Sequence, residues 1–286
     1  VGCVEVDATD PLYILYTSGT TGKPKGIIRD NGGHAVALNF SMKYVYGMNP
    51  GEVFWAASDV GWVVGHSYIV YAPLIYGCTT IMFEGKPIRT PDASTFWRVI
   101  ADHDVRVMFT APTAIRAIKK EDPDAELMKK HDLSGLRYQF LAGERCDAAT
   151  LAWTQEKLGI PVIDHWWQTE SGWPMLANMM GYAPHEVKPG SATKPVCGYN
   201  LQILREDGSE ANRDEEGFVC IKLPMPPGTL PNLWGDTERF FHGYLKTFRI
   251  LILSGYFLFF IVFIVKTTVL LSFLTSTARH SSGNFF

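Results

Sequence analysis

A loop of small, hydroxylated and basic residues near the start of the chain could hold phosphate groups. It reads Ser18-Gly19-Thr20-Thr21-Gly22-Lys23-Pro24-Lys25-Gly26. Glycines let the backbone curl around phosphate oxygens, to which amides, hydroxyls and the two lysines can donate. Pro24 follows Lys23, so this is not a Walker loop, in which a magnesium-binding hydroxyl comes directly after the lysine. A plain turn remains the alternative for such a cluster.

A second chemistry-bearing group, Trp166-Trp167-Gln168-Thr169-Glu170, lies far downstream. Magnesium that is shared with phosphate favours one or two carboxylates, and Glu170 offers one. The alternatives are a solvated carboxylate and tryptophans that belong to the core. We predict that the loop and Glu170 meet at one Mg·ATP.

Strand and helix patterns alternate around these residues. Residues 13–16 suggest a buried strand, which would place the loop at a strand's carboxyl end, where open α/β sheets bind ligands. Further strands are expected at 79–83, 105–109, 138–141 and 161–163, and helices from about 91 to 103, at 114–120 and at 148–158. This alternation predicts a parallel sheet covered by helices.

The pattern changes near residue 190. Residues 201–204 and 218–221 are strand-like and flank the turn Asp207-Gly208, which predicts antiparallel hairpin structure. We divide the chain into an α/β core at 1–190, a β-rich subdomain at 191–248 and a hydrophobic tail at 249–286. Its length allows one large domain or two smaller ones.

Composition narrows the function classes. The 286 residues are 47% hydrophobic and 19% charged, and a net charge of −3 gives no electrostatic case for nucleic acid. Five cysteines without Cys-x-x-Cys spacing predict reduced thiols, and the eight histidines show no metal spacing. The amino end carries no signal sequence and no initiator methionine, so it is expected to be a cut.

Residues 16–26 resemble the signature loop of the adenylate-forming superfamily, which includes acyl-CoA synthetases, luciferases and peptide-synthetase adenylation domains. Residues 58–68, 110–116, 142–145 and 164–170 resemble its short-chain branch, the acetyl- and propionyl-CoA synthetases. The likeness runs from about residue 10 to about 248. It implies part of the large N-terminal domain of such an enzyme, with mostly parallel sheets flanked by helices and a small distorted β-barrel segment.

The resemblance implies a ligase that uses ATP, Mg²⁺ and CoA to convert a short-chain carboxylate into an acyl-adenylate and then a thioester. Glu170 would bind Mg²⁺, and Thr169 would hold the α-phosphate and the acyl carboxylate. The β- and γ-phosphates would be held by Thr17, Ser18, Thr20, Thr21 and Lys25, with Gly19, Gly22 and Lys23 in the same loop. Adenine would lie on a backbone shelf of Gly143, Glu144 and Arg145, with Asp164 and Gln168 near its edge and His165 and Trp166 in the same nucleotide-binding set.

The resemblance also implies an acyl pocket that Trp167 closes, with Trp62, Val63 and Val64 as walls. Val64 stands where acetate-specific members have threonine, and Ala142 where they have valine. The lost volume is comparable with one substrate methylene, worth about 1–3 kcal/mol. We therefore predict propionate over acetate. Ala111 and Pro112 resemble the segment along the pantetheine tunnel.

After residue 248 the family pattern stops. A ribose-binding aspartate, a hinge and a small domain with the adenylation lysine should follow, so the chain alone is predicted to be inactive or severely impaired. Apolar residues fill 250–274 instead. They could form a single-pass membrane anchor, a tail without an evolved role, or a buried strand pair.

Two other function classes stay open. One is a non-catalytic nucleotide-binding remnant, which the tail could tether to a membrane, and the other is a different adenylating enzyme such as a carrier-protein ligase. The paired tryptophans argue against the second. Propionate-preferring relatives suggest the mitochondrial matrix as the compartment.

Overall fold

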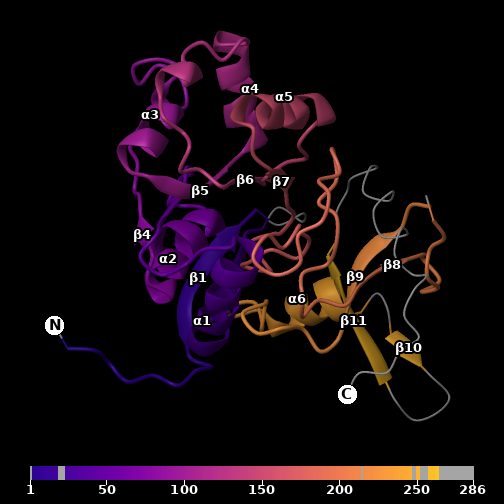
Figure 1. Cartoon of the computed structure of the whole chain (residues 1–286). Coiled ribbons are helices and arrows are strands. Elements are labelled where there is room, and N and C mark those ends of the chain that lie inside the picture. Colours follow the sequence, from indigo (N-terminus) through magenta and orange to yellow (C-terminus); the bar gives the residue numbers. More distant parts are fainter. Residues whose placement is uncertain (1, 19–22, 214, 247–248, 252–256, 264–286) are drawn as a thin grey trace.

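The computed structural model describes residues 2–18, 23–213, 215–246, 249–251 and 257–263. Its strands form three sheets, and helices flank the largest of them (Figure 1). The predicted α/β class is confirmed.

The largest sheet is parallel and has the strand order β4-β3-β5-β6-β7. Its strands are β3 (Val53–Ala56), β4 (Thr79–Thr80), β5 (Val105–Thr110), β6 (Tyr138–Leu141) and β7 (Val162–Asp164). Because both faces are covered, strands β5, β6 and β7 are largely buried and mostly apolar.

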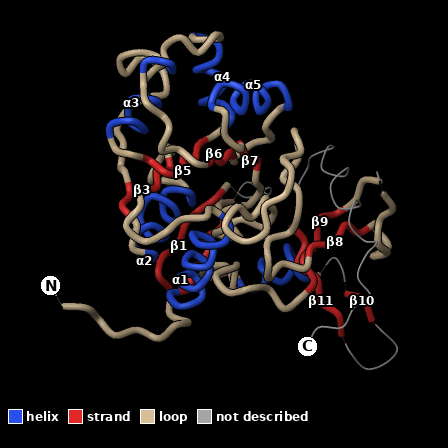
Figure 2. The backbone as a smooth tube through the Cα atoms, in the orientation of Figure 1, coloured by secondary structure: helices blue, strands red, loops and turns tan. Residues whose placement is uncertain are grey.

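Helices α3 (Thr95–Asp102), α4 (Pro112–Glu121) and α5 (Ala148–Leu158) lie on one side of this sheet (Figure 2). Helices α1 (Asn31–Phe40) and α2 (Ala72–Tyr76) lie on the other, with the short helices η1 (Ser41–Val45) and η2 (Gly65–Tyr71). Side-chain alternation divides the core accordingly. Met108 and Leu141 pack with α3, α4 and α5, whereas Phe109 and Phe140 pack with α1 and η2.

Most predicted elements of this region are present, but two differ in extent. The strand expected at 79–83 is only two residues long, because β4 is an edge strand that pairs with β3 over Thr79 and Thr80 alone. The helix expected from residue 91 begins at Thr95 after a turn. A 3₁₀ helix, η3 (Met128–Lys130), precedes β6.

The amino-terminal strand was placed wrongly by the sequence argument. β1 (Pro11–Thr17) is not a buried strand of the parallel sheet. It pairs antiparallel with β2 (Lys25–Asp30) in a separate two-stranded sheet, in which Thr17 faces Lys25 across the hairpin. The connection at 18–24 is too short for a parallel crossover, which needs a dozen or more residues.

An antiparallel sheet of order β10-β11-β9-β8 forms the remainder, as the pattern after residue 190 predicted for β8 and β9. It contains β8 (Leu201–Leu204), β9 (Phe218–Lys222), β10 (Arg249–Leu251) and β11 (Phe257–Phe263). The helices α6 (Thr237–Phe240) and η4 (Phe241–Leu245) precede β10.

The described part of the hydrophobic tail forms strands. β11 pairs antiparallel with both β9 and β10, as the strand-pair alternative expects. Within the described ranges, no helix combines the length and apolarity needed to cross a membrane. Residues 252–256 and 264–286 of the predicted tail lie outside the described residues. All five cysteines are free thiols, as predicted.

Candidate active site

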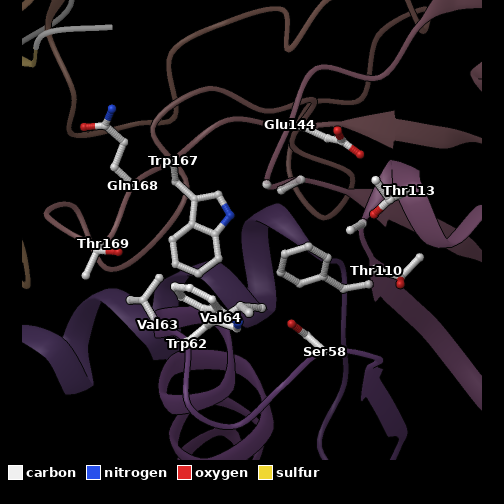
Figure 3. Close-up of a pocket in the computed structure, with 14 residues that line it drawn as sticks. Ser58, Trp62, Val63, Val64, Thr110, Thr113, Glu144, Trp167, Gln168 and Thr169 are labelled. Carbon is white, nitrogen blue, oxygen red and sulfur yellow. The ribbon is translucent and has the colours of Figure 1, made fainter. Parts of the chain in front are cut away.

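A cavity of about 500 Å³ opens at the carboxyl edge of the parallel sheet (Figure 3). The segments that follow β3, β5, β6 and β7 all reach it, since carboxyl ends of parallel strands meet at one edge of a sheet. Its lining consists of Ser58, Trp62, Val63, Val64, Phe109, Thr110, Ala111, Thr113, Ala142, Gly143, Glu144, Trp167, Gln168 and Thr169. Ten predicted site residues are among these fourteen, brought together from four separate stretches of sequence.

All five predicted acyl-pocket residues line this cavity. The indole of Trp167 extends toward Trp62 and Val64 (Figure 3). It is held edge-on by Tyr68, with 5.4 Å between ring centroids. Since Tyr68 is fully buried, Trp167 has a rigid support and can act as a fixed wall.

The predicted adenine shelf is the turn after β6. Gly143 has a φ of 101°, a conformation that favours glycine, and no atom lies within 4 Å of where its Cβ would be. The Glu144 carboxylate is turned toward Arg116 of α4, to which it is 2.5 Å distant. The backbone of the turn therefore stays open to a flat ligand while the side chain of Glu144 is engaged elsewhere.

Asp164 ends β7 beneath this turn. Its carboxylate accepts a hydrogen bond of 3.2 Å from the backbone N–H of Cys146. Burial raises the pKa of Asp164 to about 7, although the Cys146 N–H and the Arg145 charge act in the opposite direction.

Four of the residues predicted around the adenine do not line the cavity, namely Arg145, Asp164, His165 and Trp166. His165 is buried in the core, where its ring nitrogens lie 2.8 Å from the Leu141 carbonyl oxygen and 3.0 Å from the Tyr46 hydroxyl. Burial lowers the pKa of His165 to about 4. Trp166 pairs through its backbone with Leu176. His165 and Trp166 support the segment that carries Trp167 and Thr169.

The phosphate loop and the predicted magnesium ligand meet. The Lys25 ammonium donates to Glu170 Oε1 at 2.9 Å, although 145 residues separate them in sequence. The buried Oγ1 of Thr17, one residue before the loop, has no hydrogen-bond partner among the described residues. Within the loop, Ser18 and Lys23 are exposed, and the predicted site residues Gly19, Thr20, Thr21 and Gly22 lie outside the described residues.

Sequence reasoning missed a buried arginine that supports this meeting point. Arg29 of β2 is fully buried and donates to the carbonyl oxygens of Thr169, Glu170, Ser171 and Gly228. Gly172 makes room for the guanidinium, because a Cβ there would lie 2.5 Å from Arg29 Cζ. Arg29 thus ties the hairpin that carries the phosphate loop to the segment that carries Thr169 and Glu170. The only sequence signal was a charge in the otherwise apolar run 27–29.

A second missed group comes from α6 and η4. Arg239 donates to the carbonyl oxygens of Lys23 at 2.6 Å and Pro24 at 3.1 Å. Tyr244 contacts both Lys25 and Glu170 through its hydroxyl. Neither residue belongs to a recognisable motif, so only the fold shows that they lie beside the loop.

The Glu170 carboxylate suits Mg²⁺, because it is a hard oxygen donor with a side chain only 13% exposed, next to a loop suited to phosphate. In the part of the chain that the structure describes, no group of three or more histidine, cysteine or acidic side chains could hold a metal ion. Magnesium that is shared with nucleotide phosphates needs no such group.

The predicted CoA residues are split between two environments. Ala111 lines the 500 Å³ cavity and also an adjoining cavity of about 750 Å³, whereas Pro112 is buried at the start of α4.

Comparison with known proteins defines the class of this fold and site. The family model of the AMP-binding enzymes matches residues 2–226. The chain belongs to this family.

Its relatives include proteins of the short-chain branch. Acyl-CoA synthetase short-chain family member 3, mitochondrial, of Homo sapiens is 52% identical over 247 residues, which are 86% of this chain and 36% of that protein. Propionate–CoA ligase of Escherichia coli is 48% identical over 244 residues, 85% of this chain and 38% of that protein. An uncharacterized protein of Pseudomonas aeruginosa is 55% identical over 243 residues, 85% of this chain and 39% of that protein. The chain therefore spans well under half the length of these relatives.

Proposed function

We propose that the chain forms the ATP- and acyl-binding part of a short-chain acyl-CoA synthetase. Such an enzyme joins a carboxylate to AMP with release of pyrophosphate and then transfers the acyl group to CoA. The observation that carries the proposal is the contact between Lys25 and Glu170 beside a cavity lined by Thr169 and Trp167. The names of the relatives support the same reaction class.

Charge is the main obstacle in this chemistry, since a carboxylate must approach an anionic phosphate. Positioned cations and hydroxyl donors therefore matter more than a base. Thr169 would donate to the α-phosphate or the acyl carboxylate, and Lys25 with the hydroxyls of residues 17–21 would hold the β- and γ-phosphates. Glu170 would hold Mg²⁺, which supplies positive charge to the phosphate oxygens when bound.

Acyl size would be set by the floor of the cavity. Val64 and Ala142 line it together with Trp167, as the volume argument for propionate over acetate requires. Trp167 would leave no space for long chains. The name of the Escherichia coli relative agrees with this substrate class.

CoA would approach along Ala111, which lies between the two adjoining cavities. The mitochondrial relatives suggest the mitochondrial matrix as the compartment.

Calorimetry with hydrolysis-resistant acyl-sulfamoyl adenosines tests the binding function without requiring turnover. We expect the propionyl compound to bind in competition with ATP. We expect Glu170→Gln to reduce the Mg²⁺-dependent affinity for ATP more than it reduces the affinity for the sulfamoyl compound. Propionate-dependent ATP–pyrophosphate exchange then measures adenylation by the same chain. Absence of both nucleotide and analogue binding would refute the proposal.

A further inference from the structure

The hydroxyl of Tyr244 stands between the two charged groups of the site. It accepts a hydrogen bond of 2.6 Å from Lys25 Nζ and donates one of 3.1 Å to Glu170 Oε1. Lys25 Nζ also lies 5.1 Å from the centroid of the Tyr244 ring. Tyr244 is 6% exposed, so these contacts form in a largely water-excluded place.

The position of Tyr244 is fixed by its own segment. Asp236 caps α6 by accepting from the Arg239 N–H at 3.2 Å, and the Tyr244 ring packs against Phe240 with 5.7 Å between centroids. Arg239 ties the same segment to the carbonyl oxygens of Lys23 and Pro24. The segment at 236–245 therefore carries Tyr244 and also binds the phosphate loop that carries Lys25.

Binding of Mg·ATP changes the groups that Lys25 and Glu170 must contact. Under the proposed function, Lys25 must turn to phosphate and Glu170 to the metal, so their mutual ion pair cannot persist unchanged. Glu170 would then lose the donor that now orients it. The Tyr244 hydroxyl can keep donating to Glu170, because its own proton does not depend on Lys25.

We propose that Tyr244 is a positioning residue that orients the Glu170 carboxylate for Mg²⁺ and supplies Lys25 with an acceptor until the nucleotide phosphates replace it. This inference rests on the proposed function. Groups that hydrogen-bond a metal ligand from behind commonly change metal affinity by 10–100-fold when removed. A carboxylate that is already oriented also loses less rotational freedom when it binds the ion.

The test compares the affinity for α,β-methylene-ATP with and without Mg²⁺, by calorimetry on this chain. We expect Tyr244→Phe to reduce the Mg²⁺-dependent gain in affinity about tenfold relative to the unmodified chain. Affinity in EDTA should change little, because the ring remains and Lys25 keeps the ammonium group that contacts phosphate. The binding of Mn²⁺ with the same nucleotide, followed by electron paramagnetic resonance, should weaken in parallel.

Tyr199→Phe is the matched control. Tyr199 is also buried, and its hydroxyl forms a hydrogen bond of 3.2 Å with the Thr229 hydroxyl. It should keep the Mg²⁺-dependent gain of the unmodified chain. In a Glu170→Gln background, Tyr244→Phe should have no further effect on that gain, because the carboxylate that it orients is gone.

Three results would overturn the inference. The Mg²⁺-dependent gain could survive Tyr244→Phe, affinity could fall equally with and without Mg²⁺, or the effect could persist in the Glu170→Gln background. Each of these leaves the proposed function intact, because the unmodified chain still binds Mg·ATP. If the unmodified chain binds no nucleotide, the proposed function fails and this inference fails with it.

Discussion

Ala142 is the single side chain on which the proposed acyl preference depends most. It is 6% exposed and lines the cavity together with Val64 and Trp167. Two added methyl groups at this position would occupy volume that a propionyl chain needs and an acetyl chain does not.

We therefore expect Ala142→Val to move selectivity from propionyl- toward acetyl-sulfamoyl adenosine by about 1–3 kcal/mol, or roughly 10- to 200-fold. Calorimetric affinities for the two analogues measure the ratio. The surface substitution Ala149→Val on α5 is the control and should leave the ratio unchanged. If Ala142→Val weakened both analogues equally, Ala142 would not be the residue that sets acyl size.

Site residues could be predicted from sequence where they belong to a long motif. They could not be predicted where only the fold brings them to their partners. Trp167 and Ala142 could be expected at one cavity because whole segments around them resemble a family, and both line it. Arg29 could not, because it binds backbone carbonyls, which carry no sequence signature. Its site becomes evident only when Gly172, 143 positions away, leaves space for the guanidinium.

At the scale of elements, α5 supports the turn that carries Gly143. Asp147 caps the helix by accepting from the Thr150 N–H at 2.8 Å, and it lies 3.4 Å from Arg116 of α4. Arg116 in turn holds Glu144 of the turn. The cap therefore links two helices to one edge of the cavity.

We expect Asp147→Ala to lower the free energy of unfolding by about 1 kcal/mol, because the first turn of α5 loses an acceptor for its free N–H groups. Urea unfolding followed by far-ultraviolet circular dichroism measures the loss. Asp147→Ser keeps a capping oxygen but loses the charge that faces Arg116, so it should retain most of the stability. Equal losses in the two variants would assign the effect to the ion pair and not to the cap.

The bounds of α5 and β6 could be predicted because capping and periodicity are local signals. The pairing of β1 could not, since an apolar run of four residues is equally compatible with a central strand and a hairpin arm. The short connection between Thr17 and Lys25 was the available signal for a hairpin. For the same reason, the edge strand β4 proved shorter than its apolar run, because hydrogen-bonding partners and not composition decide where an edge strand ends.

At the scale of the whole molecule, buried titratable groups determine how stability changes with pH. Burial lowers the pKa of His34 to about 3, with the Arg29 and His66 charges adding to the effect, and lowers that of His165 to about 4. In the unfolded chain both histidines become protonated near their ordinary pKa of 6.5, and in the folded chain they do not. Stability from both histidines is therefore complete above pH 6.5 and decreases as the pH falls toward 4.

Asp164 changes the pH dependence of stability in the opposite direction. Its pKa rises from 3.8 to about 7 on folding, chiefly through burial, so between these values the folded chain binds the extra proton. Its contribution grows as the pH falls from 7 to about 4. Two histidines against one carboxyl group leave a net loss of stability on acidification between pH 6.5 and 4.5.

Two substitutions separate these contributions by sign. His34→Phe preserves the ring packing against Tyr13 and Tyr71 and removes two ring nitrogens that have no hydrogen-bond partner among the described residues. It should therefore reduce the loss of unfolding free energy on acidification by about 1.4 kcal/mol per pH unit. Asp164→Asn removes the opposing group and should steepen the decline by about the same amount. Urea midpoints from pH 7 to 4.5 measure both slopes. A common slope for the unmodified chain and the two variants would show that neither group changes its proton affinity on folding, and that acid sensitivity arises elsewhere in the molecule.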